Sequence, residues 1–118
     1  MNAPDLQLSS STLTKPDRRR YPRYTVQVQV EIHPEGSQLP MRLVTTDLSR
    51  GGCYIKVTDQ LPLGVHVKTT LWLDDYPIVI RGLVVTRHPQ FGNGIMFLDF
   101  EGGAEPILTR YLDAIVSN

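Results

Sequence analysis

The first part of the sequence with residue types suited to ligand chemistry is an arginine-rich segment that ends at Arg23. Between Lys15 and Arg23 there are five basic residues and one acidic residue, although the 118-residue chain has a formal net charge of zero. Arg19 and Arg23 are spaced as R-x-x-x-R, and Pro22 should stiffen the segment and limit the entropy lost on binding. A short, dense cationic segment favours a compact anion with few phosphates over a long polyanion. The alternative is a basic tail that only improves solubility.

A second motif combines a carboxylate, a hydroxyl and a glycine. Asp47, Ser49 and Gly52 form a D-x-S-x-x-G pattern between two predicted strands. The carboxylate accepts hydrogen bonds, the hydroxyl donates or accepts them, and glycine permits a close backbone approach to a ligand or a positive φ. Each motif is weak by itself, because R-x-x-x-R often arises by chance in an arginine-rich run and D-x-S-x-x-G also fits a side-chain-capped turn.

Residue types that catalyse reactions or bind metals are present, but they form no catalytic or metal-binding pattern. The histidines His33, His66 and His88 lack the short spacing that is typical of metal ligands. Ser49 lacks the strand–G-x-S-x-G–helix context of a nucleophile. Cys53, the single cysteine, is in phase with apolar neighbours, which indicates a buried structural thiol. We therefore expect no enzymatic activity, no metal and no cofactor.

Alternation of polar and apolar residues predicts the elements that must position these motifs. From Thr25 to Ile32 a valine or isoleucine occupies every second position, which is the pattern of a half-buried strand directly after the arginines. Further on, apolar residues recur at helical spacing near the end of the chain. The other predicted ranges are 41–48, 53–57, 65–73, 78–87 and 95–100 for strands and 107–116 for the helix.

Turn residues separate these elements and indicate the fold class. Residues 74–77 and 91–94 are predicted to form turns, and Gly82 is predicted to mark a bulge or bend inside its strand. Six short strands followed by one amphipathic helix favour an all-β fold. We expect a small six-stranded antiparallel β-barrel with the C-terminal helix packed against it.

Length and composition bound the domain organisation. A chain of 118 residues with 41% hydrophobic and 20% charged residues fits one globular domain. Residues 1–16 are polar and aperiodic, and we expect a disordered leader there, followed by a single domain at 17–118. No apolar run approaches the roughly 20 residues that span a bilayer. Because the pattern of a signal peptide is also lacking, a cytoplasmic protein without a membrane partner is expected.

The two motifs, in this order and on this strand pattern, resemble the PilZ family of small six-stranded β-barrels, which bind the bacterial second messenger cyclic di-GMP. The resemblance covers residues 17–116, and the segment at 92–97 is similar to the glycine-rich start of the family's last strand. The motif positions that match are Arg19, Arg23, Asp47, Ser49 and Gly52. The resemblance implies a barrel with a C-terminal helix, acting as a bacterial cyclic di-GMP receptor.

The chemistry of cyclic di-GMP fits these residue types. The ligand is a compact dianion with two guanines, and an arginine fork meets guanine O6 and N7, or phosphate oxygens, through two hydrogen bonds. Arg19 and Arg23 are the expected partners of those acceptors. Asp47 is the expected acceptor for the guanine N1–H and N2–H donors, with Ser49 beside it. Gly52 is expected to let the backbone approach the ligand.

Two further arginines extend the expected site. Arg18 directly precedes the first motif, and domains of this family take up either one cyclic di-GMP or an intercalated pair. A guanidinium at Arg18 could meet the second molecule of such a pair; alternatively, Arg18 and Arg20 only raise the local positive potential. Arg50 lies inside the second motif and is another candidate phosphate partner.

A domain of this size must act through another molecule. We expect the ligand to order the arginine segment over the dinucleotide, so that an unidentified effector protein recognises the changed surface. Two alternatives stay open: a PilZ-like protein-interaction adaptor that binds no ligand, and a small-barrel module for single-stranded nucleic acid. The nucleic-acid alternative is disfavoured because aromatic and basic residues do not interleave along a strand face.

Overall fold

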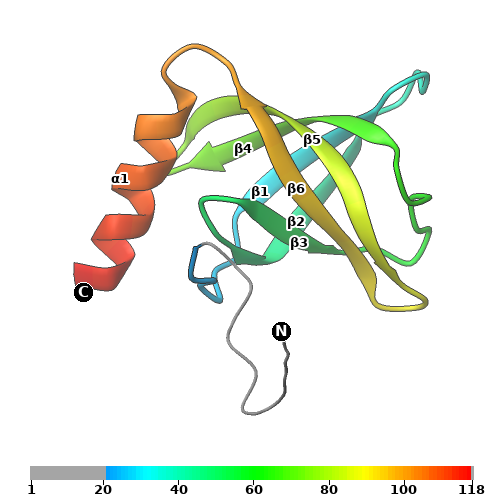
Figure 1. Cartoon of the computed structure of the whole chain (residues 1–118), viewed down its shortest axis with the longest axis horizontal. Helices are drawn as coiled ribbons and strands as arrows, with labels where there is room; N and C mark the ends of the chain where they lie inside the picture. Colours follow the sequence, from blue (N-terminus) through cyan, green and yellow to red (C-terminus); the bar gives the residue numbers. More distant parts are fainter. Residues whose placement is uncertain (1–20, 118) are drawn as a thin grey trace, which may run out of the picture.

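Alternating apolar side chains on six strands build a closed barrel, which one helix covers at its end (Figure 1). The computed structural model describes residues 21–117. Neighbouring strands within this range are antiparallel and follow the order β1-β2-β3-β6-β5-β4, and β4 pairs with β1 to close the barrel. The elements are β1 (Gln29–Pro34), β2 (Met41–Leu48), β3 (Gly52–Lys56), β4 (His66–Leu73), β5 (Tyr76–His88), β6 (Gly92–Phe100) and α1 (Ala104–Ser117).

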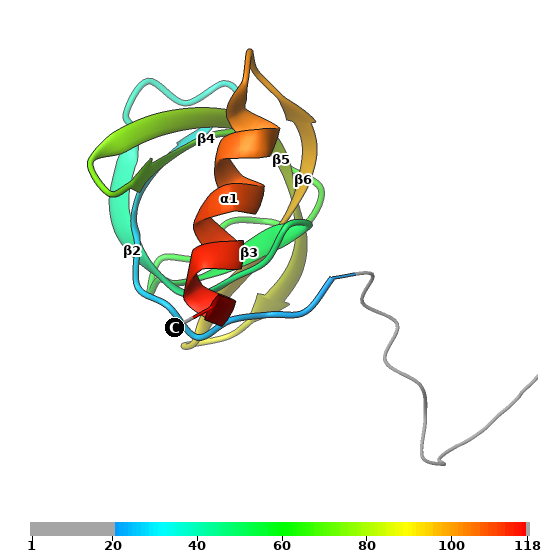
Figure 2. The ribbon, with the colours of Figure 1, turned by 90° about the vertical axis from the view of Figure 1, so that its left-hand side faces the viewer.

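The core lies inside the barrel and beneath the helix. Burying an aliphatic side chain of this size contributes about 1.5–3 kcal/mol, so the inward-facing residues supply the main stabilisation. Figure 2 shows α1 lying across one end of the barrel, and its buried residues Ala104, Leu108 and Leu112 recur every four positions. The fully buried aliphatic residues of the strands include Ile32, Leu48, Ile55, Leu71 and Ile80. The predicted all-β barrel with a C-terminal helix is confirmed.

The first strand begins four residues later than the alternation predicted, and Thr45 explains the difference. Val28 is buried as expected, but its N–H donates to Thr45 Oγ1 at 3.0 Å. The same hydroxyl donates to the carbonyl of Val26 at 2.8 Å. The Thr45 side chain thus takes the place of regular strand pairing before Gln29, and β2 changes register just after Thr45.

Two of the predicted turn features are confirmed. A tight hairpin joins β4 to β5 at the predicted place, but it is shorter than the predicted range 74–77, because Tyr76 and Pro77 already belong to β5. Its two residues, Asp74 and Asp75, have positive φ values, of 52° and 69°. Pairing between β5 and β6 shifts register between Arg81 and Gly82, where a bulge or bend was predicted. Within residues 21–117, no helix is both long enough and apolar enough to cross a membrane.

The turn predicted at residues 91–94 is wrong. The chain reverses just earlier, with Gln90 at a φ of 69°, and β6 already begins at Gly92. A Cβ at Gly92 would collide with the carbonyl oxygen of Ile55, and a Cβ at Gly94 would collide with Thr86 Oγ1. These two glycines therefore serve close packing within the sheet rather than chain reversal.

Candidate functional site

A pair of backbone hydrogen bonds brings the two sequence motifs together. The N–H of Tyr24 donates to the carbonyl of Leu48, and the N–H of Leu48 donates to the carbonyl of Tyr24, both at 2.9 Å. Arg23 directly precedes Tyr24, and Leu48 lies inside the second motif. The end of the arginine segment is thereby fixed beside the start of the D-x-S-x-x-G turn.

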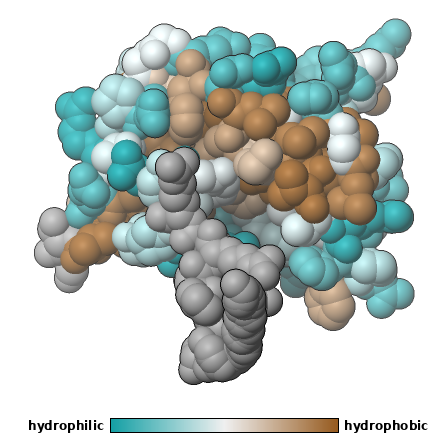
Figure 3. Space-filling model, in the orientation of Figure 1, coloured by the Kyte–Doolittle hydropathy of each residue, from teal (hydrophilic) through white to brown (hydrophobic). Residues whose placement is uncertain are grey.

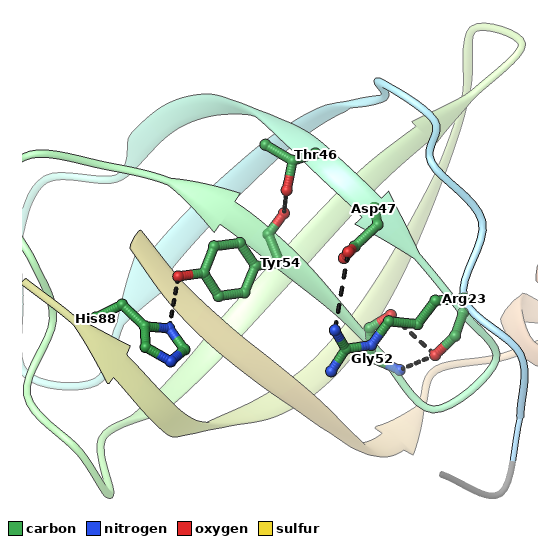
Figure 4. Close-up of polar contacts among 7 residues, drawn as sticks. Arg23, Thr46, Asp47, Gly52, Tyr54 and His88 are labelled. Atoms are coloured by element: carbon green, nitrogen blue, oxygen red, sulfur yellow. Dashed lines mark hydrogen bonds and ion pairs between the residues drawn. The ribbon is translucent and has the colours of Figure 1, made fainter. Parts of the chain in front are cut away.

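Arg23 and Asp47 face each other across this junction (Figure 4). Their nearest charged atoms, Nη1 of Arg23 and Oδ2 of Asp47, are 3.9 Å apart, and the side chains are 50% and 27% exposed. An ion pair of this length and exposure contributes about 1 kcal/mol or less to stability. Both charged groups therefore stay accessible to a ligand that offers better-placed partners.

Ser49 uses its hydroxyl inside its own turn. Ser49 Oγ accepts hydrogen bonds from the N–H groups of Gly51 and Gly52, both at 3.1 Å, and is placed to donate to the Gly52 carbonyl at 3.3 Å. The backbone N–H of Ser49 also donates to that carbonyl, at 2.8 Å. Ser49 is 9% exposed, so its observed role is to shape the turn. Direct contact between Ser49 and a ligand stays a prediction.

Close packing against β6 requires a glycine at position 52. Gly52 pairs with Met96 of β6, and a Cβ at this position would collide with the carbonyl oxygen of Ile95. Gly52 does not adopt a positive φ. The close backbone approach expected at Gly52 is thus present, but the structure shows it toward β6.

Tyr21 packs on the second motif and holds Arg50. The guanidinium carbon of Arg50 lies 4.8 Å from the centroid of the Tyr21 ring, which is within the range of a cation–π contact. The same ring also lies against Gly51, where a Cβ would be 3.3 Å from Tyr21 Cδ2. Arg50 is exposed and lies beside the arginine segment. A phosphate contact by Arg50 stays a prediction.

Tyr21 and residues of both motifs border a pocket of about 420 Å³ on the outer face of the barrel. Its rim includes Tyr21, Arg23, Asp47 and Ser49, while β3, β5 and β6 contribute Tyr54, Val85, Thr86, Gly94 and Met96. This volume is in the usual range for small-molecule sites. Figure 3 shows apolar surface gathered where β5 and β6 run.

The contributions of β3, β5 and β6 to the pocket were not predicted from the sequence. Val85 is 44% exposed and Met96 is 41% exposed, although both are apolar. The signal that could have found Met96 is an apolar residue at an outward-facing position of an alternating strand. Tyr54 and Thr86 carry no comparable signal, because neither their type nor their spacing is unusual in a strand.

Cys53 borders the pocket, but its thiol is unreactive. Its side chain is buried, as predicted, and burial raises the pKa of the thiol to about 12, with the Asp47 carboxylate adding to the shift. The thiol is therefore protonated and unreactive at neutral pH. Among the described residues, no group of three or more histidine, cysteine, aspartate or glutamate side chains is placed to hold a metal ion.

Arg18 and Arg19 lie outside the residues that the structure describes, as does the predicted leader at 1–16. Of the predicted site residues, the structure brings together Arg23, Asp47, Ser49, Arg50 and Gly52. Arg50 does not line the pocket itself; it contacts Tyr21, which does.

Comparisons with known proteins agree with this architecture. The chain is similar to the PilZ domain of CeSA from a cellulose-synthesizing bacterium, with a TM-score of 0.64 and 19% identity over 79% of this chain and 96% of that one. The Bacillus subtilis inhibitor of motility MotI/DgrA gives a TM-score of 0.63 and 19% identity, over 87% of this chain and 54% of that one.

A third similar structure is the PilZ domain of YcgR from Escherichia coli, which was solved with c-di-GMP. It gives a TM-score of 0.58 and 13% identity, over 86% of this chain and 91% of that one. A comparison with curated protein sequences gave no significant match. The family model of the PilZ domain matches residues 17–114, which is most of the sequence. This chain therefore belongs to the PilZ domain family.

Proposed function

We propose that this protein is a receptor for cyclic di-GMP and that the ligand binds at the pocket on the outer face of the barrel. The observation that carries the proposal is the meeting of Arg23 and Asp47 at the pocket rim, 3.9 Å apart. Arg23 can donate two parallel hydrogen bonds, and Asp47 can accept hydrogen bonds. Recognition of guanine requires both a donor and an acceptor of this kind. The similar fold of the E. coli domain, solved with c-di-GMP, supports the ligand class.

Each charged group has a chemical role in this proposal. Asp47 accepts from the guanine N1–H and N2–H groups, and Arg23 donates to guanine O6 and N7 or to a phosphate. The long, partly exposed ion pair between them is exchanged for these shorter contacts when the ligand binds.

The remaining arginines of the predicted site add positive charge around the same pocket. Arg19 is four residues from Arg23, so their Cα atoms are at most ~14 Å apart, which keeps Arg19 within reach of a ligand at the rim. Arg50 is held beside the rim by Tyr21 and serves a phosphate. Arg18 serves the second molecule when an intercalated pair binds.

Binding is relayed through the arginine segment. The barrel is closed and each strand pairs with two neighbours, so the change on binding falls on the chain before Tyr24. The ligand draws that segment over the pocket, and a partner protein recognises the new surface.

Titration calorimetry with cyclic di-GMP tests the proposal, with GTP and linear diguanylate as controls. We expect saturable binding of cyclic di-GMP and much weaker binding of both controls, because neither control presents two guanines on a closed dianionic ring. Absence of cyclic di-GMP binding would overturn the proposal and favour a protein-interaction adaptor.

A further inference from the structure

Tyr54 lies across the outer face of β6 and connects β3 to β5. It pairs with Gly94 on β6, and a Cβ at Gly92 would be 3.0 Å from Tyr54 Cε2. The ring thus packs closely over Gly92, which carries no side chain. Its hydroxyl reaches the last residue of β5, where it shares a hydrogen bond of 2.8 Å with Nδ1 of His88 (Figure 4).

The partners of Tyr54 are themselves held in place. The imidazole of His88 is tilted by 41° to the tyrosine ring, with centroids 5.7 Å apart. The backbone carbonyl of His88 accepts a hydrogen bond from the side chain of Gln60, which in turn accepts one from Nε of Arg87 at 3.1 Å. An aromatic ring fixed at both ends loses little entropy when a ligand packs on it.

This ring forms part of the pocket, next to the predicted base-reading residue. Tyr54 is partly buried and lines the pocket together with Asp47, its register partner across β2 and β3. Base recognition commonly combines hydrogen bonds to the edge of a base with stacking on an aromatic face. Asp47 offers the first of these, and Tyr54 is the adjacent aromatic ring.

We propose that Tyr54 is a stacking platform for one guanine of the ligand and that His88 is the residue that positions it. This inference rests on the proposed cyclic di-GMP function and adds a residue outside both sequence motifs. The ring also packs close to Gly92, where a Cβ would collide first with the carbonyl oxygen of Ile55 and would lie 3.0 Å from Tyr54 Cε2.

Calorimetry with cyclic di-GMP on three variants tests the platform. Tyr54→Ala should weaken binding about ten- to a hundredfold, which is the effect of removing one stacked aromatic ring. Tyr54→Phe keeps the ring but loses the hydrogen bond to His88, so its affinity should lie between those of the parent and Tyr54→Ala. Tyr76→Ala is the matched control, because Tyr76 is 58% exposed and lies outside the pocket, and it should bind like the parent.

The outcomes separate the two proposals. If the parent binds and Tyr54→Ala binds equally well, the platform is wrong while the cyclic di-GMP function stands. If the parent does not bind, both are wrong. A second measurement needs no destabilising substitution: in the labelled parent protein, the ring protons of Tyr54, assigned with Tyr54→Phe, should shift upfield on ligand binding. Binding without that shift overturns the platform.

A double-mutant cycle tests the positioning role of His88. His88→Ala should weaken binding in the parent, because the tyrosine hydroxyl loses its partner and the ring its fixed orientation. In the Tyr54→Phe background the same substitution should have no further effect, since the hydrogen bond is already lost. Equal losses in both backgrounds would show that His88 acts independently of Tyr54 and would overturn its positioning role.

Discussion

The backbone hydrogen bonds of the next residue, Tyr24, position Arg23, and its ion pair with Asp47 contributes little to that position. The two hydrogen bonds between Tyr24 and Leu48 fix the chain beside the pocket, while the contact between Arg23 and Asp47 is long and half exposed. The guanidinium is thus available for ligand contacts without a large cost to the fold.

Removal of this guanidinium should therefore affect binding more than stability. Arg23→Ala loses a contact worth about 1–3 kcal/mol, so cyclic di-GMP affinity should fall about ten- to a hundredfold. Arg19→Ala should behave similarly. Calorimetry measures the affinity, and thermal unfolding should show a stability change of about 1 kcal/mol or less for Arg23→Ala.

Arg42 provides the control for the loss of an exposed ion pair. It is 82% exposed, lies 3.3 Å from Glu31 and is outside the pocket. Arg42→Ala should leave cyclic di-GMP affinity unchanged. Parent-like binding by both Arg19→Ala and Arg23→Ala would show that the arginine motif is not the site.

Asp47 is expected to decide which base is bound. Its carboxylate accepts from the guanine N1–H and N2–H groups, which adenine lacks. Asp47→Ala should therefore narrow the difference in affinity between cyclic di-GMP and cyclic di-AMP, measured by calorimetry with both ligands. Equal losses for the two ligands would mean that Asp47 only shapes its turn.

At the scale of elements, the contact between β3 and β6 constrains the second motif. Gly52→Ala would push a methyl group into the carbonyl oxygen of Ile95 and should cost about 1–3 kcal/mol, as overpacking typically does. Gly103 is the control, because a Cβ there meets nothing within 4 Å and its φ is not positive. Urea unfolding should show a change of about 0.5 kcal/mol or less for Gly103→Ala. Equal stability of the two variants would contradict the packing role of Gly52.

Local periodicity predicted most of the strands but not the contacts between distant ones. Thr45 delays the start of β1 by bonding to Val26 and Val28, and nothing in the alternation of residues 25–32 indicates that partner. Gly92 was predicted to lie in a turn because glycine is common there, whereas it packs against Ile55 and Tyr54 of β3. Strand pairing brought these residues together, so the pocket wall could not be predicted from spacing along the chain.

The motifs themselves were found because their chemistry is local. Arg23 and Asp47 stand out by residue type and spacing, and the structure brings their side chains together. Ser49 and Gly52 were found by the same pattern, yet their observed contacts serve the turn and the sheet. Residue type alone could not separate a ligand contact from a structural one.

At the scale of the whole molecule, the pocket lies outside a closed barrel. A ligand there can bind without repacking the core, and a second molecule could stack on the first without opening the sheet. What limits a stacked pair is charge, because two cyclic di-GMP molecules bring four phosphate charges close together. Arg19, Arg23 and Arg50 offer three positive charges against these four.

Arg18 supplies the fourth charge in this account, so its removal should change the stoichiometry. Arg18→Ala should convert two ligands per domain to one and leave the first binding event largely intact. Binding should also depend less on salt, because one fewer charge contact is screened as the Debye length falls to ~8 Å at physiological ionic strength. Calorimetry at two salt concentrations measures both effects. A parent that binds one ligand, or a variant that still binds two, would remove Arg18 from this role.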